Sequence, residues 1–568
     1  MPDAVWRRRH GLPLSEYAAC VASLVLGPVL RHVGLHDATV WVETDRSCTV
    51  RILGSKARTF EISNHHYGLV TVEGLASGER YDYTVQLDDD TVWPDPSAGY
   101  PPSAIATLSE AGPVRLIFGS CRLAYPHSQP FTLPPQQHEV GRGVDALTAL
   151  GERLRHQPSD ERPDLILHLG DQVYSDELPL SMREYVHQRR RRVPGPENEV
   201  VDFEEFTQLY KTSWREPTLR WLLSTVSNSM IFDDHDVHDD WNTSLAWRQR
   251  MEQVPWWHER MVSAFMSYWI YQHAGNLDPQ ALADEGLLDR LQLHRGDAAA
   301  VLREFAEQAH HHPEVRRWSY RRDLGRTRLL VIDSRAGRVL EPGQRDMLDA
   351  AEWRWVEENL KREVDHMLVA STLPVFMPRS LHDLEAWNER VTDGAWGKGA
   401  VGFAETVRQA LDLEHWAAFQ RSFAHLARLL LETASGEHGW TPATISCLGG
   451  DVHFGYIAQV DTPGSQAPIY QLVCSPLRNL LEGGKRRVLK LGLSPAGTLI
   501  ARALARLAGC PPLPVSWRIT HGPWFENHFG DLVLDGRRAR LAIREALPGR
   551  HPALRTRLLV WLDRRALS

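Results

Sequence analysis

The feature that most constrains this chain is a set of short apolar runs that each end in polar residues. The run Leu165–Leu169 (LILHL) is mostly apolar and leads straight into Gly170 and Asp171, with Tyr174 three residues further on. Such a run predicts a strand buried on both faces, and the glycine predicts a sharp turn after it. Ligands of α/β sheets bind in the crevice outside the carboxyl ends of the strands. Asp171 and Tyr174 are therefore candidate site residues.

Four more predicted strands end in the same way. Their polar ends contain Gly119-Ser120-Cys121-Arg122, Asp233-Asp234-His235-Asp236, Asp333-Ser334-Arg335 and Gly449-Gly450-Asp451-Val452-His453. One such cluster has little meaning, because a solvated turn has the same composition. Several clusters at the ends of buried strands together predict a site built from distant parts of the chain.

The chain is too long for one hydrophobic core, and its pattern changes along its length. Residues 27–108 alternate apolar and polar side chains at period two, which predicts a small β-sandwich that resembles a fibronectin-type domain, with Asp88–Pro102 as the linker. From residue 113 to 545, strands alternate with helices, which predicts an α/β catalytic domain with a helical insertion at 245–312. Residues 1–26 and 546–568 are interpreted as an N-terminal extension and a C-terminal tail.

Composition excludes several classes of protein. The net charge of −8 argues against nucleic acid as a partner, since phosphate backbones require clustered cations, and we interpret the one dense basic run, Arg189–Arg192, as a solvated face. No segment approaches the ~18 uninterrupted apolar residues of a membrane span. The six cysteines are too scattered for a disulfide framework. We expect a cytoplasmic protein, with export by an atypical signal left open, and the sequence does not give the oligomeric state.

The polar clusters supply the ligand types of a metal centre. The thiol of Cys121, the phenol of Tyr174 and the imidazole of His453 accompany the carboxylates of three aspartates, Asp171, Asp234 and Asp451. Oxygen donors suit ferric iron, calcium, magnesium or manganese, whereas thiolate and imidazole suit iron or zinc. A shared carboxylate such as Asp171 can bridge two metals about 3.5–4 Å apart, the arrangement that supports displacement at phosphorus.

Two further residues are candidates for direct roles in such a reaction. His235 is flanked by Asp233, Asp234 and Asp236, which would hold a charged imidazole, so we predict that it is the general acid. Arg335 follows a buried strand and is a candidate for binding the substrate phosphate. An ion pair with Asp333 that closes the turn is the alternative interpretation of Arg335.

Five motifs in this order resemble the alkaline phosphatase D (PhoD-like) family of calcineurin-like metallophosphoesterases. They are FGSC (118–121), HLGDQVY (168–174), FDDHD (232–236), IDSR (332–335) and GGDVHF (449–454). The resemblance implies a four-layer αββα core with two or more metal ions, Fe³⁺ and Ca²⁺, with Mn²⁺, Mg²⁺ or Zn²⁺ as alternatives. It assigns as ligands Cys121, Asp171, Tyr174, Asp234, Asp451 and His453.

The sequence departs from the family pattern after the DDH segment. An asparagine pair of the family is replaced by Asp239 and Asp240, with Asn242 beyond, so the sequence leaves open which of the three reaches the second metal. Ser371 and Thr372 stand where most metallophosphoesterases have a histidine, as in this branch.

The resemblance implies metal-dependent hydrolysis of small phosphate monoesters or diesters. The alternatives are a nuclease, a phospholipase and a non-catalytic module that retains the fold. A phospholipase needs an exposed apolar rim, for which the tryptophan-rich insertion around Trp256, Trp257 and Trp269 is the candidate. The sequence leaves the physiological substrate, its ester type and the resident metals open.

Overall fold

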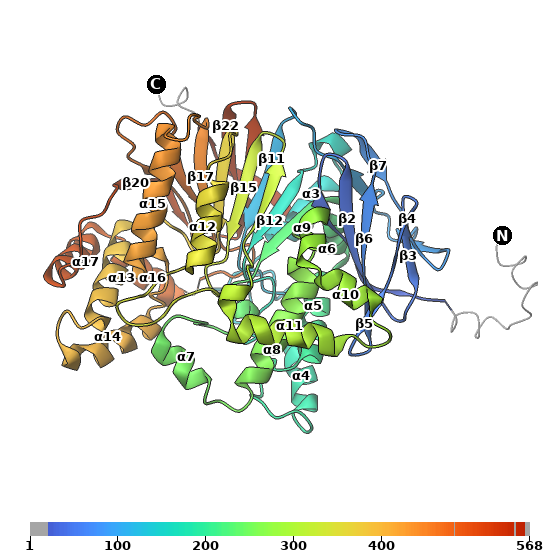
Figure 1. The fold of residues 1–568 in the computed structure, drawn as a ribbon, viewed down its shortest axis with the longest axis horizontal. Helices are drawn as coiled ribbons and strands as arrows, with labels where there is room; N and C mark the ends of the chain where they lie inside the picture. Colours follow the sequence, from blue (N-terminus) through green and yellow to red (C-terminus); the bar gives the residue numbers. More distant parts are fainter. Residues whose placement is uncertain (1–20, 482, 550–551, 563–568) are drawn as a thin grey trace, which may run out of the picture.

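The protein has a mixed α/β fold with several β-sheets and a separate β-rich region at its N-terminal end (Figure 1). The structure is a computed structural model that describes residues 21–481, 483–549 and 552–562. The first 20 residues of the expected N-terminal extension lie outside the described residues.

The N-terminal region is a β-sandwich, as the period-two pattern predicts. One sheet has the order β1 (Leu24–Val33), β2 (Asp37–Thr44), β6 (His65–Glu73), β5 (Phe60–Ile62), and the other β4 (Ser55–Arg58), β3 (Thr49–Ile52), β8 (Val85–Leu87), β9 (Asp90–Trp93). A short pair, β7 (Arg80–Asp82) and β10 (Ala104–Ala106), completes it. Strand β9 lies in the segment expected to be a linker, because its backbone pairs with β8.

The first central sheet has six strands. Their order is β13 (Ser227–Ile231), β12 (Leu165–Leu169), β11 (Val114–Gly119), β21 (His528–Asp535), β22 (Arg538–Leu547) and β23 (Ala553–Trp561). The first three run parallel, and β21 to β23 add an antiparallel meander. The segment predicted to be a C-terminal tail thus contributes strand β23. Its residues pair with β22 from Arg540 to Leu547.

The second central sheet has seven strands. Their order is β14 (Tyr320–Leu324), β15 (Thr327–Ile332), β16 (His366–Ser371), β17 (Thr444–Gly449), β19 (Ile469–Val473), β18 (Gly455–Val460) and β20 (Trp517–Trp524). Strands β15, β16, β17 and β19 are parallel, so their carboxyl ends share one edge.

Alternate residues of the seven-stranded sheet pack in two different cores. Leu329 and Leu368 belong to the core that contains Leu116 and Leu167 of the six-stranded sheet. Their neighbours Leu330 and Met367 instead belong to a core with side chains of α12 (Ala350–Asn359) and α15 (Gln420–Ser435). Because successive side chains of a strand point to opposite faces, the sheet has the six-stranded sheet on one face and helices on the other. Helix α3 (Ala146–Leu154) packs on β22 and β23.

Several helices begin elsewhere than predicted, or were not predicted at all. The sequence pattern predicts helices at 344–360 and 411–433. Helix α12 instead begins at Ala350, and α15 begins at Gln420 because a 3-10 turn (Trp416–Ala418) precedes it. Helices α13 (Arg379–Thr392), α14 (Lys398–Ala410), α16 (Gly483–Gly492) and α17 (Pro495–Leu507) were not predicted. All four lie together at one end of the molecule (Figure 1).

The segment 181–225 and the insertion are helical, as predicted. The first contains α4 (Leu180–Arg189), α5 (Phe203–Trp214) and α6 (Pro217–Thr225), and the second α7 (Leu245–Met251), α8 (Trp257–Tyr268), the π-helical turn η3 (Trp269–His273), α9 (Pro279–Glu285), α10 (Leu287–Leu293) and α11 (Ala299–His311). The sequence contains three consecutive histidines, 310–312, which we interpret as a helix end and not as a metal site. Helix α11 ends at His311, so the run lies at a helix end. Trp257 and Trp269 are buried in the core, so these two tryptophans form no apolar rim.

Candidate metal centre

The carboxyl ends of the parallel strands of both sheets meet at one place. After β11, the Cys121 thiol lies 3.2 Å from the Ser475 hydroxyl, which follows β19, and 3.5 Å from the Asp451 carbonyl oxygen, which follows β17. The Asp451 amide donates to the Ser120 hydroxyl over 2.9 Å. Loops from the two sheets are therefore joined at Cys121, which is fully buried.

Four of the predicted ligands have a left-handed backbone. The φ angles are 57° at Cys121, 53° at Asp171, 65° at Asp451 and 55° at His453. Non-glycine residues in this region cost on the order of 1–3 kcal/mol each and cluster at functional sites. The strand that precedes each residue is regular, so the strain is confined to the residue that turns its side chain into the site.

Gly170 brings Asp171 next to the strand end of β13. Its φ of 91° is left-handed, and a Cβ added there would lie 2.5 Å from the Asp233 Cβ. Only glycine fits both the dihedral angle and this close approach. The Gly-Asp pair of the sequence is therefore required at this position for packing as well as for the turn.

Three aspartates form the densest group of carboxylates in the site. One oxygen each of Asp171, Asp233 and Asp234 lies within 4.8 Å of the others. Asp171 Oδ1, Asp233 Oδ2 and Asp234 Oδ1 are buried and have no hydrogen-bond partner among the described residues. Burial raises the pKa of all three carboxyl groups, and for Asp171 and Asp233 it rises well above the ordinary value. Buried carboxylate oxygens without donors are what a cation would satisfy, so these residues fit a metal.

Tyr174 and His453 are connected to this group through Asn479. The Tyr174 hydroxyl donates to Asp171 Oδ2 over 3.1 Å and accepts from Asn479 Nδ2 over 3.1 Å. His453 Nδ1 lies 2.9 Å from the Asn479 carbonyl oxygen. A proton on Nδ1 would bond that carbonyl and leave the Nε2 lone pair for a metal, a common arrangement around ligating histidines. Sequence reasoning missed Asn479, which no strand-end pattern marks.

His235 has a carboxylate partner that the sequence did not identify. Its Nδ1 lies 2.8 Å from Asp176 Oδ1, and its ring packs 4.5 Å from the Tyr174 ring centroid. Burial lowers the pKa of His235, but the charge and hydrogen bond of Asp176, with Asp234, raise it well above the ordinary value. The direction agrees with the expectation from flanking carboxylates, although the main cause is Asp176.

Of the flanking carboxylates, Asp236 has a structural role. Its oxygens accept the backbone amides of Asp171 and Asp233 at 2.9 Å and of Val173 at 3.3 Å. Asp236 therefore holds the two aspartate loops together and does not face His235. Asp176 lies two residues after Tyr174, just beyond the HLGDQVY motif, and this position is the signal that could have identified it.

The Arg335 guanidinium is fully buried among carboxylates. It contacts Asp233, lies 2.6 Å from Glu414 Oε2, 3.2 Å from Asp234 Oδ1 and 3.6 Å from Asp451 Oδ1. Asp333 instead accepts the backbone amide of Arg335 over 2.8 Å, which closes the turn without a side-chain ion pair. The alternative Asp333–Arg335 side-chain pair is thus not formed.

A third histidine enters the site from a part of the chain without any motif. His415 Nε2 lies 3.0 Å from Asp451 Oδ2, and its Nδ1 lies 2.7 Å from Glu385 Oε1 on α13. Burial raises the pKa of Asp451, but the hydrogen bond and charge of His415, with Arg335, lower it below the ordinary value. His415 and Glu414 precede α15 within the segment predicted to be a helix at 411–433, and no motif marks either residue.

The contacts of Asp239, Asp240 and Asn242 bear on which of these residues could reach a second metal. Asn242 donates to the Arg335 carbonyl oxygen over 3.1 Å and accepts from Arg248 over 3.3 Å, so its amide is already engaged. Asp239 Oδ1 lies 3.8 Å from His235 Nε2, and Asp240 Oδ1 is buried with no hydrogen-bond partner among the described residues. Asp239 and Asp240 are the two that face the centre with carboxylate oxygens.

Comparison with known proteins agrees with this architecture. The sequence model of the PhoD-like phosphatase family matches residues 151–488, which include the Asp171, Asp234, Arg335 and Asp451 loops. The chain belongs to the PhoD-like phosphatase family. A domain of unknown function, DUF7800, matches residues 21–105, the β-sandwich. No curated protein matches the sequence.

A solved structure shares the fold of this PhoD-like phosphatase. A structure described as that of PhoD is 13% identical, covers 95% of this chain and 91% of its own, and superposes with a TM-score of 0.57. The purple acid phosphatase PPD1 from yellow lupin (Lupinus luteus) seeds is 9% identical and covers 95% of this chain and 75% of its own, with a TM-score of 0.46. The family membership makes the protein a metal-dependent phosphoric ester hydrolase.

Proposed function

We propose that this PhoD-like phosphatase hydrolyses small phosphate monoesters or diesters at the centre around Asp171. The observation that carries the proposal is the group of three buried aspartates, in which Asp171 Oδ1 and Asp233 Oδ2 have no hydrogen-bond donor among the described residues and Asp234 Oδ1 lies 3.2 Å from Arg335. Leaving such groups unsatisfied is costly, so a cation is the natural partner. The packing of the two central sheets between helices supports a four-layer αββα arrangement of the catalytic core.

The proposed ligands are Cys121, Asp171, Tyr174, Asp234, Asp451 and His453, with Asp239 or Asp240 completing the second site. Their mixture of thiol, phenol, imidazole and carboxylate suits Fe³⁺ together with Ca²⁺, and Mn²⁺, Mg²⁺ or Zn²⁺ are the alternatives. When bound, two such ions would supply an activated water and neutralise charge on the phosphoryl oxygens.

The chain's own residues carry the proton and orient the groups. His235, held by Asp176, donates a proton from Nε2 to the leaving-group oxygen, because its Nδ1 is engaged. We assign Arg335 to charge balance between Asp233, Asp234, Glu414 and Asp451, since its guanidinium is buried against them. Binding of the substrate phosphate is the other role proposed for Arg335.

A cavity lined mainly by the helical insertion lies next to the Arg335 loop. It has a volume of about 440 Å³ and is lined by Trp241, Asn242, His258, His310 and Ala336, among others. This volume lies within the usual range of small-molecule sites, roughly 300–1,000 Å³. Its wall shares the Arg335 loop with the metal centre, through Ala336 and Asn242.

Elemental analysis combined with turnover tests the proposal. We expect the purified protein to contain at least one metal ion per chain and to hydrolyse p-nitrophenyl phosphate or its bis-ester in a chelator-sensitive manner. Asp171→Asn is expected to lose both metal and turnover. Asp531→Asn is the matched control, because this buried carboxylate lies within β21, is held by Arg115 and Arg544, and should affect stability without removing metal. A wild-type protein with neither metal nor turnover would favour the non-catalytic module.

A further inference from the structure

The helices α16 and α17 expose large aliphatic side chains to solvent. Leu491, Leu499, Ile500 and Leu507 are 72%, 71%, 61% and 74% exposed. The opposite face of α17, formed by Ala501, Ala505 and Ala508, is buried against α13 and α14 through Trp387, Val391 and Ala404. Leu499, Ile500 and Leu507 therefore form a second, exposed apolar face of α17, opposite its packed face.

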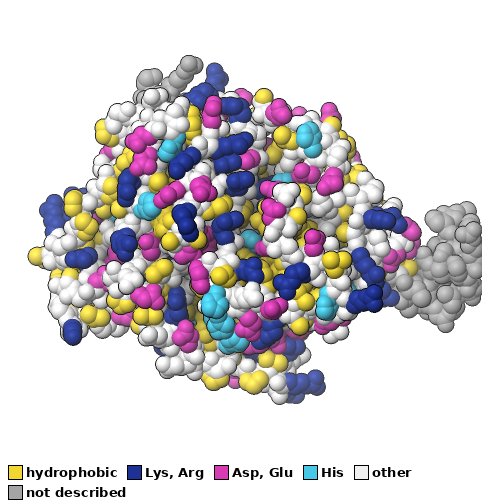
Figure 2. All heavy atoms as spheres, viewed as in Figure 1, with side chains coloured by type: hydrophobic (Ala, Val, Ile, Leu, Met, Phe, Trp, Pro, Cys, Tyr) yellow, Lys and Arg dark blue, Asp and Glu magenta, His cyan; other side chains and the backbone are white. Residues whose placement is uncertain are grey.

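The same two helices are strongly basic. Residues 483–509 contain Lys485, Arg486, Arg487, Lys490, Arg502 and Arg506 and no acidic residue, in a chain of net charge −8. Hydrophobic and basic side chains lie together at the left-hand edge of the molecule, where Figure 1 places α17 (Figure 2). Exposed aliphatic and cationic side chains on one helix pair are typical of helices that lie in the interface of an anionic membrane.

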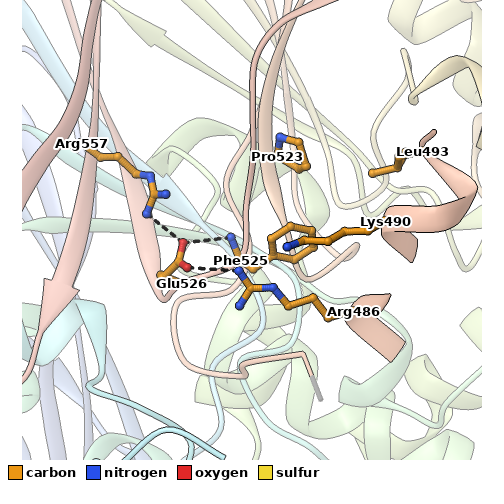
Figure 3. A pocket seen from close by; sticks show the side chains of 7 residues that line it. All are labelled: Arg486, Lys490, Leu493, Pro523, Phe525, Glu526 and Arg557. Carbon is orange, nitrogen blue, oxygen red and sulfur yellow. Dashed lines mark hydrogen bonds and ion pairs between the residues drawn. The ribbon is translucent and has the colours of Figure 1, made fainter. Parts of the chain in front are cut away.

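A cationic cavity lies at the base of this helix pair. It has a volume of about 350 Å³ and is lined by Arg486, Lys490, Leu493, Phe525 and Arg557, with Glu526 as its acidic member (Figure 3). Arg557 lies 2.8 Å and Arg486 3.4 Å from Glu526, whereas Lys490 lies over the Phe525 ring at 5.5 Å. Arg557 also lies 2.8 Å from Glu545 Oε2, so Arg486 and Lys490 supply the positive charge that remains in the cavity for an anionic group.

The helices fit the surface of a membrane and not its interior. No single described helix is long and apolar enough to cross a bilayer, and α16 with α17 reach the required length and composition only when joined across a bend of 66°. The packed face of α17 and the cations on both helices leave only the exposed side of α17 for lipid. This is a shallow insertion, in which long basic side chains remain at the headgroup level.

We propose that α16 and α17 dock this protein onto the surface of an anionic lipid membrane. Leu499, Ile500 and Leu507 insert among the acyl chains, and the surrounding lysines and arginines face the headgroups. The docked face is connected to the metal centre through α13. Helix α17 packs on α13, whose Glu385 holds His415 against Asp451.

Vesicle binding of the full chain tests this proposal. We expect the wild type to float with vesicles of phosphatidylcholine and phosphatidylglycerol but weakly with phosphatidylcholine alone, and to be released by salt. The triple variant Leu499→Ser, Ile500→Ser, Leu507→Ser should bind at least about tenfold less. Each of Arg502→Gln and Arg506→Gln should weaken binding to the anionic vesicles about fivefold.

The matched control is the pair Leu293→Ser and Val315→Ser, whose side chains are 82% and 58% exposed in the insertion. This control should bind as the wild type does, and all variants should keep their thermal stability and vesicle-free phosphatase turnover. Failure of the wild type to bind anionic vesicles would overturn the proposal, as would equal losses in the triple variant and the control. A dimer in solution that the triple variant dissociates, without vesicle binding, would instead identify a second copy of the chain as the partner.

Discussion

His235 and Asp176 form a buried pair in which Nδ1 of the imidazole lies 2.8 Å from a carboxylate oxygen. The side chain of His235 is 19% exposed and that of Asp176 9%, so water screens the pair little. The charge of His235 and its hydrogen bond lower the pKa of Asp176 below the ordinary value, although burial alone would raise it. An ionised Asp176 thus fixes the ring and keeps a proton on His235, as a general acid requires.

The first prediction concerns the leaving group. A general acid matters most for poor leaving groups, because p-nitrophenolate departs without a proton. His235→Ala should therefore lower turnover of alkyl phosphates about 100-fold or more and that of p-nitrophenyl phosphate much less. Metal content should stay near that of the wild type. Equal losses on both substrates together with loss of metal would make His235 a ligand.

Asp176→Asn should show the same selectivity in a milder form. Asp176 acts through His235, so the substitution weakens the acid without removing it. The ratio of alkyl to aryl turnover should fall between that of the wild type and that of His235→Ala. An unchanged ratio with a lowered melting temperature would mean that Asp176 serves only the fold.

The second prediction concerns Cys121. Burial and the Asp451 charge raise the pKa of this thiol to about 11, so it becomes a thiolate only beside a cation. Cys121→Ser should lower metal content together with activity, measured by elemental analysis. Cys447→Ser is the matched control, since Cys447 is equally buried in β17, away from the site. Full metal content with lost turnover in Cys121→Ser would contradict the ligand assignment.

The third prediction separates the two roles of Arg335. Removing one partner from a buried ion pair costs about 3–5 kcal/mol, because the remaining charges are uncompensated. If Arg335 balances charge, Arg335→Met should lower the free energy of unfolding by that order, and Arg335→Lys should restore part of it. Denaturant unfolding measures both variants. Unchanged stability of Arg335→Lys with a strongly raised KM would favour the phosphate clamp.

The fourth prediction is a pH dependence of stability at the contact between the β-sandwich and α5. His65 Nε2 lies 2.6 Å from Glu204 Oε2, and the Glu204 pKa falls from 4.5 to about 2, mainly through this hydrogen bond. Burial lowers the pKa of His65, but the hydrogen bonds that its ring donates to Glu204 and Glu43 raise it above 6.5. The lowered pKa of Glu204 stabilises the fold above pH 4.5, and this stabilisation is lost as the pH falls toward 2. The raised pKa of His65 stabilises the fold below pH 6.5, and this stabilisation is lost as the pH rises through the folded pKa of His65.

The contact should therefore contribute most between pH 4.5 and 6.5. Melting temperatures of the wild type and His65→Gln, measured across pH, should differ most in this window and converge above it. Lys211 also lies 3.2 Å from His65 Nδ1, so it opposes but does not reverse the effect. A difference that is constant with pH would exclude His65 as its source.

The sequence by itself determined the strands and the residues that follow them. A short apolar run such as Leu165–Leu169 is consistent with a strand buried on both faces, and its short length and the turn residues that follow it favour a strand over a helix. Parallel strands in one sheet bring their carboxyl ends to one edge, so Cys121, Asp171 and Asp234, which follow β11, β12 and β13, could be expected together before any contact was known. Asp451 follows β17 of the other sheet, so its place beside them depends on how the two sheets pack. The family motifs reinforced that expectation because the same residues recur in the same order.

Only the tertiary structure decided how charge is arranged around these residues. Arg335 pairs with Asp233, which is 102 residues away, and His415 reaches Asp451 from a segment without any motif. Such partners are fixed by how the two sheets and α13 pack, since side-chain contacts over long sequence distances leave no periodic signal. Helices α16 and α17 were missed for a related reason: their outward face stays exposed to solvent, so the folded core does not account for its leucines.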